Sequence, residues 1–165
     1  MEEWQTGDVA AFEAFFRQHE KGVFKNAYLI TGSRQDAEDV LQEVFTSVWK
    51  SRHTFDPNKG KVTTWLHRIT VNECIRKHRR EHRPEVRIDP ADLADTVAEV
   101  GAPDYDRLTD AMEGLDTRHR AVLVLRYFND LSYDEIARAL DVPLGTVKSR
   151  INHALKILRK RLADG

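Results

Sequence analysis

Apolar side chains recur every three or four positions through the first half of the chain, which is the spacing that places them on one face of an α-helix. A first set comprises Val9, Phe12, Phe15, Phe16, Val23, Phe24, Ala27, Tyr28 and Ile30. Thr31-Gly32 is a stop signal, and Ser33 followed by Asp36 resembles a capping box that starts a second helix. The stripe then resumes at Ala37, Val40, Leu41, Val44, Phe45, Val48 and Trp49. We therefore predict two consecutive amphipathic helices.

A polar loop separates these helices from a third one. The stretch from His53 to Gly60 contains Asp56-Pro57 and the turn-forming sequence Asn58-Lys59-Gly60. A helix is predicted from about Val62 to His82, and its buried side carries Trp65, Leu66, Ile69 and Ile75.

The pattern changes between Pro84 and Pro103, where Pro, Asp and Ala accumulate and the apolar residues are small and scattered. We interpret this segment as a linker. Four further helices are predicted at 105–113, 117–127, 132–140 and 144–162, and no stretch shows the alternation of a β-strand. The expected fold is all-α, with two small helical domains, residues 1–83 and 104–165, joined by a flexible acidic linker, residues 84–103.

Residues 132–153 carry the strongest local signal. Ser132-Tyr133-Asp134-Glu135 has the pattern of a capping box, and Pro143 ends the short helix because it lacks an amide donor. A basic helix follows directly. Two short helices with a tight turn between them, the second one basic, are typical of a helix-turn-helix, which we predict in the second domain.

The second helix of this motif divides into a packing face and an outward face. The packing face comprises Val147, Ile151, Ala154, Leu155 and Leu158. The outward face is polar and cationic near the helix start, where a recognition helix contacts base edges, and it comprises Lys148, Ser149, Asn152, His153 and Lys156, with Arg150 at its flank. Thr146 lies at the amino-terminal end, whose free amides can hold a phosphate. A helix that is merely solvated would show the same polar face. The capped first helix and the proline turn favour a DNA-contacting helix over this alternative.

Charge is distributed unevenly, although the net charge is only -1. Residues 56–83 contain eight Lys/Arg and three Asp/Glu, residues 84–117 contain two and ten, and residues 145–162 contain six and none. Two basic segments separated by an acidic one favour two contact surfaces for a polyanion. Three solvated helix faces of differing charge are the plainer alternative.

Composition and the amino terminus argue against a membrane or secreted protein. Charged residues make up 32% of the chain and are interspersed, so we expect no apolar span of about 20 residues and no membrane insertion. The start, Met1-Glu2-Glu3-Trp4, lacks the basic and apolar stretches of a secretory signal. One cysteine, Cys74, cannot form an internal disulfide, which favours a reducing cytoplasm.

No arrangement of residues predicts catalysis, a cofactor or a small-molecule substrate. The sequence lacks a Gly-rich phosphate loop and any nucleotide-binding motif. Cys74, His78 and His82 lie four residues apart on one predicted helix, but their full span of about 12 Å is too long for one ion. We expect no enzyme, no catalytic residue and no metal site.

Two blocks of the sequence resemble extracytoplasmic-function (ECF) sigma factors of the sigma-70 family. The first block contains 36–45 and 65–72, and the second contains 120–127, 131–137 and 142–150. The resemblance implies a protein that directs RNA polymerase core to specific promoters, with sigma region 2 in the first domain and sigma region 4 in the second. It also implies the β′ and β subunits of polymerase, promoter DNA and an anti-sigma factor as partners, and a cytoplasmic protein that is nucleoid-associated when bound to polymerase.

The resemblance assigns residues to three surfaces by position. The polymerase-binding set is Asp36, Asp39, Gln42 and Glu43, which also lie opposite the apolar stripe of their helix. The minus-ten set, which would hold the opened strand with a base flipped out, is Asn58, Lys59, Lys61, Trp65, Arg68, Asn72, Arg76, Lys77, Arg79 and Arg80. The last four are expected on the DNA backbone. Trp65 could stack on a base, but its spacing with Leu66 and Ile69 favours a core position.

The third surface, the minus-thirty-five set, is Thr146, Lys148, Ser149, Arg150, Asn152, His153 and Lys156. His153 departs from the arginine that the family often has there, and a neutral histidine offers one donor and one acceptor where arginine offers a fork. The promoter sequence is therefore left open, and mildly pH-sensitive recognition is expected.

A stand-alone helix-turn-helix regulator is the alternative interpretation. Such a protein would use its first half as a sensor or dimerisation domain and would bind duplex DNA without polymerase, usually as a dimer on paired half-sites. The basic loop and helix at 58–83 favour the sigma factor, because a ligand sensor has no need for them.

Overall fold

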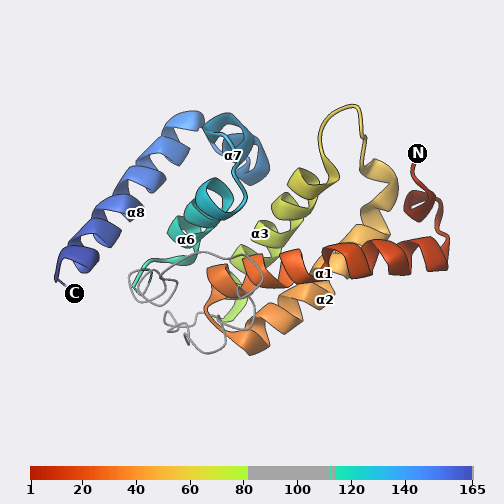
Figure 1. The fold of residues 1–165 in the computed structure, drawn as a ribbon, viewed down its shortest axis with the longest axis horizontal. Coiled ribbons are helices and arrows are strands. Elements are labelled where there is room, and N and C mark those ends of the chain that lie inside the picture. The colour runs from red at the N-terminus through yellow and green to blue at the C-terminus, as the bar shows by residue number, and fades with distance from the viewer. Residues whose placement is uncertain (82–111, 113, 165) are drawn as a thin grey trace.

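The computed structural model describes residues 1–81, 112 and 114–164, and every regular element within them is helical (Figure 1). The first half comprises the short turns η1 (Glu3–Thr6) and η2 (Arg52–Thr54) and the helices α1 (Val9–Thr31), α2 (Arg34–Ser51) and α3 (Val62–Glu81). The second half comprises α6 (Thr117–Leu123), the π-helical turn η3 (Val124–Phe128), α7 (Tyr133–Leu140) and α8 (Leu144–Asp164). The all-α prediction is confirmed. The predicted linker and, apart from Met112, the predicted helix at 105–113 lie outside the described residues.

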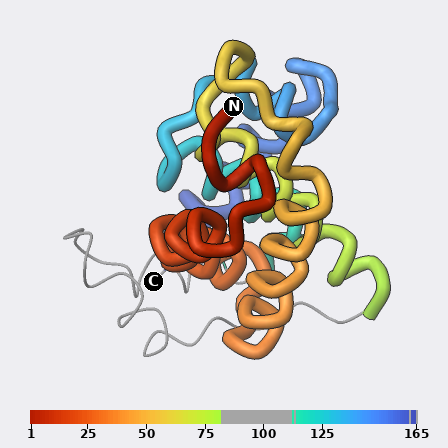
Figure 2. The backbone as a smooth tube through the Cα atoms, turned by 90° about the vertical axis from the view of Figure 1, so that its right-hand side faces the viewer, coloured from red at the N-terminus to blue at the C-terminus, as the bar shows by residue number. Residues whose placement is uncertain are grey.

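Local signals place the helix ends of the first half close to the predicted positions. At the start of α1, Oδ1 of Asp8 accepts a hydrogen bond from the Ala11 amide at 2.8 Å, and α1 ends at Gly32, whose φ is 74°. The Ser33 hydroxyl accepts from the Asp36 amide at 3.3 Å and starts α2. Figure 2 shows α1, in red, beside α2, in orange.

An aromatic cluster closes one end of the first half. Trp4 in η1 is 5% exposed, and its ring stacks on Phe15 with centroids 4.2 Å apart. Phe55 and Trp65 lie 6.0 and 5.9 Å from Trp4. The side-chain amide of Gln5 donates to the Phe55 carbonyl at 2.8 Å and anchors η1 beside the cluster. The packing role of this segment could not be predicted from the sequence, because a turn of four residues is too short to show a period.

The second half has the predicted helix-turn-helix. The Ser132 hydroxyl accepts from the Glu135 amide at 3.1 Å, and the Glu135 carboxylate accepts from the Ser132 amide at 2.7 Å, which completes the capping box at the start of α7. Asp141 ends α7 with φ at 53°, a left-handed conformation that aspartate tolerates. The packing face of α8 is as predicted, since its buried residues are Val147, Ile151, Ala154 and Leu158.

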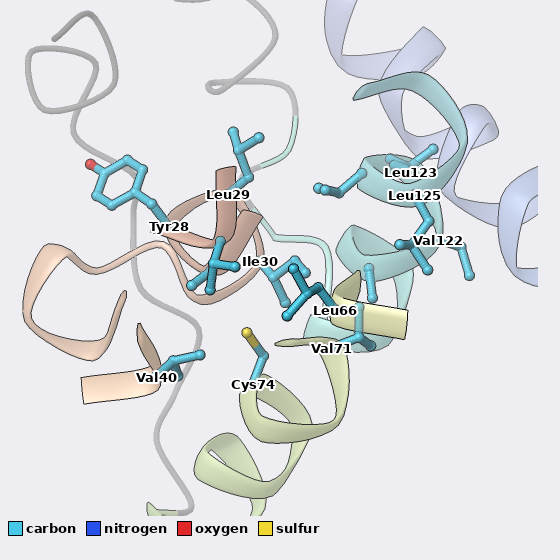
Figure 3. Packing of buried hydrophobic residues seen from close by; sticks show 14 of the residues in the cluster. Tyr28, Leu29, Ile30, Val40, Leu66, Val71, Cys74, Val122, Leu123 and Leu125 are labelled. Atoms are coloured by element: carbon cyan, nitrogen blue, oxygen red, sulfur yellow. The ribbon is translucent and has the colours of Figure 1, made fainter. Parts of the chain in front are cut away.

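The two halves share one apolar core. Helices α6 and α7 pack against α1 and α3, so the second half lies along one side of the first (Figure 1). Figure 3 shows the side chains at this contact, with Leu66 and Val71 of α3 beside Val122 and Leu125 of the second half. All four are at most 2% exposed, so the contact excludes water.

A buried polar network also joins the halves. Asn26 of α1 is 3% exposed, and its Oδ1 accepts a hydrogen bond from Nδ2 of Asn129 at 3.2 Å. Its own Nδ2 lies 3.0 Å from Nδ1 of His67. Because an amide nitrogen only donates, the network assigns the acceptor role to Nδ1 of a neutral His67. Burial, and after it the nearby His19, lower the pKa of His67 to about 4.

Replacing Trp4 tests the aromatic cluster. Trp4→Ala removes the ring that stacks on Phe15, and we expect the free energy of unfolding to fall by about 3–5 kcal/mol. Urea denaturation followed by circular dichroism measures this change. Val9→Ala is the control, because Val9 is 73% exposed and its loss should cost less than about 0.5 kcal/mol. Equal effects of the two substitutions would contradict the packing role of Trp4.

Acid titration tests the network around His67. Between its pKa of 6.5 when unfolded and about 4 when folded, the unfolded chain binds a proton that the folded chain does not. Stability should therefore be full above pH 6.5 and fall by about 3 kcal/mol as the pH drops to 4. In His67→Gln the amide oxygen can still accept from Asn26 but does not titrate, so this loss should be absent.

Unfolding curves at several pH values measure the effect. His53→Gln removes an exposed histidine from η2 and is the control, because its stability should fall with pH as that of the unsubstituted chain does. If the stability of His67→Gln fell with pH just as steeply, a group other than His67 would be responsible for the loss.

Candidate nucleic-acid and protein interfaces

The loop between η2 and α3 presents two lysines around a tight turn. The Asn58 amide donates to Oδ1 of Asp56 at 2.9 Å, and the Lys59 amide donates to the Asp56 carbonyl at 3.0 Å. These bonds are typical of an aspartate-led turn, and they fix the backbone of the loop. Asn58, Lys59 and Lys61 are all exposed.

An open cavity of about 680 Å³ lies beside this loop. Lys59, Lys61 and Arg68 supply cationic groups to its lining, and Trp65 supplies an aromatic ring. The ring of Trp65 is partly buried, with its centroid 5.4 Å from that of Phe55. Trp65 is therefore both a member of the aromatic cluster and part of the cavity wall.

Helix α7 of the second half forms another wall of the same cavity, through Glu135, Arg138 and Ala139. The hydrogen bond from the Ser132 backbone lowers the pKa of Glu135, and the positive charges of Arg138 and Lys61 act in the same direction. A carboxylate thus lies within the field of the loop lysine. None of these α7 residues was predicted as a site residue, because the sequence does not show which helix of the second half meets α3.

The predicted minus-ten residues of α3 separate onto two sides of the helix. The side that faces the second half carries Arg68, Asn72, Arg76 and Arg79, and the side that faces α2 carries Lys77 and Arg80. This division follows the helical period, since positions three and four apart share a face. The structure therefore brings together only some of the α3 residues that the sequence assigned to one surface.

A cavity of about 400 Å³ between the halves collects four arginines. Two come from α3, one from α6 and one from α8, and they are Arg76, Arg79, Arg118 and Arg150. Arg76 also contacts Glu73 at 3.2 Å. Burial and the neighbouring Arg118 lower the pKa of Arg150, with Asp116 opposing them. Residues predicted to contact two different promoter elements thus line one interdomain groove.

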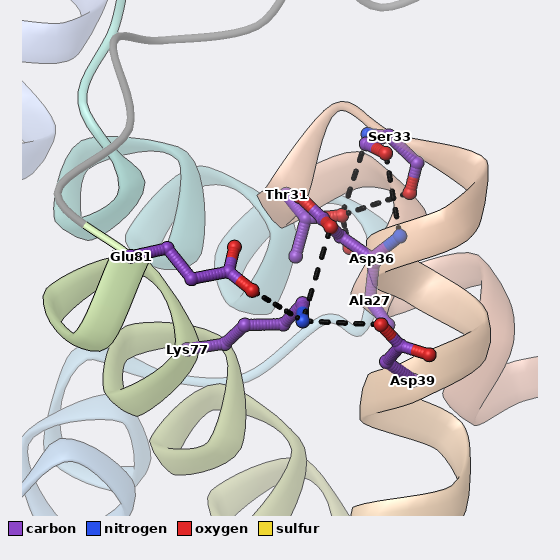
Figure 4. Close-up of polar contacts among 7 residues, drawn as sticks. All are labelled: Ala27, Thr31, Ser33, Asp36, Asp39, Lys77 and Glu81. Atoms are coloured by element: carbon purple, nitrogen blue, oxygen red, sulfur yellow. Dashed lines mark hydrogen bonds and ion pairs between the residues drawn. The ribbon is translucent and has the colours of Figure 1, made fainter.

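Lys77 lies at the centre of an acidic cluster, shown in Figure 4. Its Nζ is 2.8 Å from Glu81, 3.1 Å from Asp39 and 3.9 Å from Asp36. Burial acts to lower the pKa of Lys77, but the hydrogen bonds to Glu81 and Asp39 outweigh it, and the pKa is raised. The side chain is only 12% exposed, so Lys77 holds these carboxylates together.

Three of the four predicted polymerase-binding residues share the outer surface of α2. Asp39, Gln42 and Glu43 are exposed and line a small cavity of about 160 Å³. Asp36 is different, because it is 6% exposed and lies behind this surface beside Lys77.

Helix α8 presents the predicted outward face to solvent. Its exposed residues are Lys148, Ser149, Asn152, His153 and Lys156, and Arg150 is partly buried. The Thr146 amide donates to the Pro143 carbonyl at 3.0 Å, so the start of the helix already uses this donor.

One residue that the sequence analysis did not select, His119 of α6, lies against this face. Its ring centroid is 4.9 Å from that of His153, and its Nδ1 is 2.6 Å from Oδ1 of Asp116. Burial acts to raise the pKa of Asp116, but hydrogen bonds from the backbone and side chain of His119 outweigh it and lower the pKa. No sequence signal links residues 119 and 153, because α6 and α8 meet only in the folded protein.

Metal binding and membrane insertion have no candidate within the described part of the chain. Cys74 is 0% exposed, and burial raises the pKa of its thiol. Residues 1–81, 112 and 114–164 contain no group of three His, Cys, Asp or Glu side chains placed to hold an ion, and His82 lies outside them. No helix in these ranges is long and apolar enough to cross a membrane.

Comparison with known proteins gives two family matches and several relatives. Residues 15–84 match Sigma-70 region 2, and residues 105–158 match Sigma-70, region 4. The chain is 38% identical over 169 residues to the ECF RNA polymerase sigma factor SigE of Mycolicibacterium smegmatis, covering 96% of this chain and 65%, less than two thirds, of that protein. It is 31% identical over 175 residues to the ECF RNA polymerase sigma factor SigW of Bacillus subtilis, and the match covers 96% of this chain and 92% of that protein.

The fold is also similar to a solved structure. The sigma factor RpoE of Bartonella quintana, in complex with the anti-sigma factor NepR, matches with a TM-score of 0.71 and 20% sequence identity. The match covers 94% of this chain and 98% of that one. At this level of identity the likeness shows a shared fold.

Proposed function

The chain belongs to the ECF sigma factors of the sigma-70 family, and on this premise we propose that it directs RNA polymerase core to specific promoters and starts transcription there. One observation carries the proposal, which is the presence of two separate cationic surfaces, on α3 and on α8, in a single chain. The polymerase supplies the chemistry, so the chain is not itself an enzyme. Family matches in both halves support this function over a stand-alone regulator.

The proposed domains are residues 1–83 as sigma region 2, 84–103 as the linker and 104–165 as sigma region 4. The family matches at 15–84 and 105–158 support this division. The site of action is the cytoplasm, at the nucleoid when the chain is bound to polymerase, because polymerase and promoter DNA meet there.

The acidic outer surface of α2 is the proposed docking site for polymerase core. Asp39, Gln42 and Glu43 are exposed and contact the β′ subunit, as the family resemblance implies. Lys77 and Asp36 lie beneath them and fix the position of Asp39. Charged groups at such an interface raise the association rate and select the partner.

The cavity beside the loop at 56–61 is the proposed site for the opened minus-ten strand. Cations follow the phosphates of a single strand, and aromatic rings receive its bases. Lys59, Lys61 and Arg68 supply the first function, and Trp65 supplies the second. The cavity offers a flipped base a place outside the stack. Asn58 in the neighbouring loop and Asn72, which lines the next cavity along α3, extend the polar surface beyond it.

The exposed face of α8 is the proposed reader of the minus-thirty-five duplex. Asn152 and His153 can hydrogen-bond base edges in the major groove, whereas Lys148, Arg150 and Lys156 contact phosphates. Ser149 and Thr146 extend the polar surface toward the helix start.

The two halves must separate for both elements to be bound at once. The elements lie about 25 base pairs apart, which is about 85 Å along B-DNA. In the described arrangement, however, Arg79 and Arg150 line one groove. The 30 residues between Glu81 and Met112 can span at most about 100 Å when extended, which is enough for separation. A protein that holds the halves together, as an anti-sigma factor, would keep the chain inactive.

Run-off transcription with purified polymerase core tests the proposed function. Core with the added chain should initiate on a subset of promoters, and core alone should not. Glu43→Arg reverses a charge on the docking surface and should weaken binding to core about tenfold or more. Glu13→Arg, the same change at an exposed position of α1, should leave binding to core unaltered. Binding to promoter duplex without any initiation would contradict the proposal.

Asn152→Ala tests base reading by α8. Loss of a base contact should cost about 1–3 kcal/mol of promoter affinity and relax the preference at one position. Lys156→Gln, one turn later, should weaken all promoter variants equally and lower the slope of log affinity against log salt by about 0.9. Fluorescence anisotropy on a set of single-base variants at several salt concentrations measures both. A uniform loss with Asn152→Ala would assign that residue to the DNA backbone.

A further inference from the structure

We propose that His119 is a positioning residue for promoter reading: held by Asp116, it fixes the imidazole of His153 on α8 and so determines the base pair that His153 prefers. The inference rests on the proposed function, because it takes α8 as the reader of the minus-thirty-five element. It adds to the reading surface a residue from a different helix, α6.

The geometry forms a short chain of contacts that leads to the reading face. Oδ1 of Asp116 accepts the backbone amide of His119 at 2.9 Å, which caps α6. The same oxygen lies 2.6 Å from Nδ1 of the His119 ring. Because a carboxylate only accepts, Nδ1 of His119 carries the hydrogen. One bond from the backbone and one from the ring therefore hold His119 to its capping residue.

The ring of His153 lies against this fixed ring. The centroids are 4.9 Å apart and the planes are inclined by 51°. His119 is 21% exposed at its side chain, whereas His153 is exposed on the outward face of α8. One ring thus forms a support and the other meets the DNA.

A supported imidazole reads DNA differently from the arginine that the family often has at this position. An exposed long side chain must be ordered when it binds, which costs about 0.5–1.5 kcal/mol for each side chain immobilised. Histidine has two side-chain torsions, and contact with His119 limits them before DNA arrives. A fixed donor can then prefer a purine, whose N7 accepts in the major groove.

Charged groups surround the pair on several elements. Arg118 precedes His119 on α6, Arg150 lies on α8, and Asp116 supplies the negative charge. Replacing the His119 ring leaves these three groups in place, so its effect on base preference can be separated from the general attraction to phosphates.

The test measures base preference at each minus-thirty-five position for polymerase core bound to the full-length chain, using competition among single-base promoter variants. His153→Ala first identifies the base pair that His153 reads. His119→Ala should then lower the preference at that same pair, from about fivefold or more toward equality, and leave the other positions unchanged. His119→Phe keeps a ring against His153 but cannot donate to Asp116, so it should restore only part of the preference. The double variant His119→Ala/His153→Ala should be no less selective than His153→Ala alone.

The outcomes distinguish this inference from the proposed function. If the unsubstituted holoenzyme shows no preference at any minus-thirty-five position, the proposed function of α8 fails. If that preference exists and His119→Ala leaves it intact, or lowers affinity equally for all variants, only the positioning role fails. Thermal unfolding of each variant checks that the second half remains folded. If His119→Ala does not fold, His119→Gln, which removes the ring but keeps an amide donor, decides the question: a lowered preference at the pair that His153 reads supports the role, and an unchanged preference overturns it.

Discussion

The contact between α6 and α7 on one side and α1 and α3 on the other is the constraint on which the rest of the structure depends. It merges two sets of apolar side chains into one core, and it places Arg76 and Arg79 beside Arg118 and Arg150. Burial of Leu66, Val71 and Val122 favours the contact. Convergence of like charges opposes it: burial first, and then the nearby Arg118, lower the pKa of Arg150. Under the proposed function, a promoter offers phosphates to both sets of arginines once they have moved apart.

This balance explains why the polar groups at the contact matter. Asn26 contacts His67 within the first half and Asn129 across the contact, so one of these two bonds is lost when the halves separate. The wall that α7 contributes to the loop cavity also exists only while the halves are in contact. Its residues Glu135 and Arg138 occupy space beside the lysines that would hold a DNA strand. Closing the halves therefore restricts the minus-ten surface, while the outward face of α8 stays exposed. The two surfaces that we propose to contact the promoter are thus affected unequally by one interface.

The features that could be predicted from the sequence are those determined by local interactions. The caps at Ser33 and Ser132 and the apolar period of α8 involve residues within one or two turns, and the structure has each of them. Features that depend on long-range packing were missed. The burial of Trp4, the turn of Lys77 toward α2 and the contact of His119 with His153 each join elements distant in the sequence. Family resemblance assigned site residues to α2, α3 and α8, but it could not show that Asp36 lies beneath the surface that Asp39 presents.

The most direct test of this account is the distance between the two halves in the free chain and in a transcribing complex. Dyes attached at Lys21→Cys on α1 and Tyr127→Cys in η3 report it by energy transfer, because Lys25, one turn after Lys21, lies 5.4 Å from the ring of Phe128. The native Cys74 is 0% exposed, so the dyes react at the two introduced cysteines. We predict efficient transfer in the free chain and its near-complete loss once core polymerase and promoter DNA are added, because the halves then lie on the order of 85 Å apart. Transfer that stays unchanged in a complex that is making RNA would contradict the account.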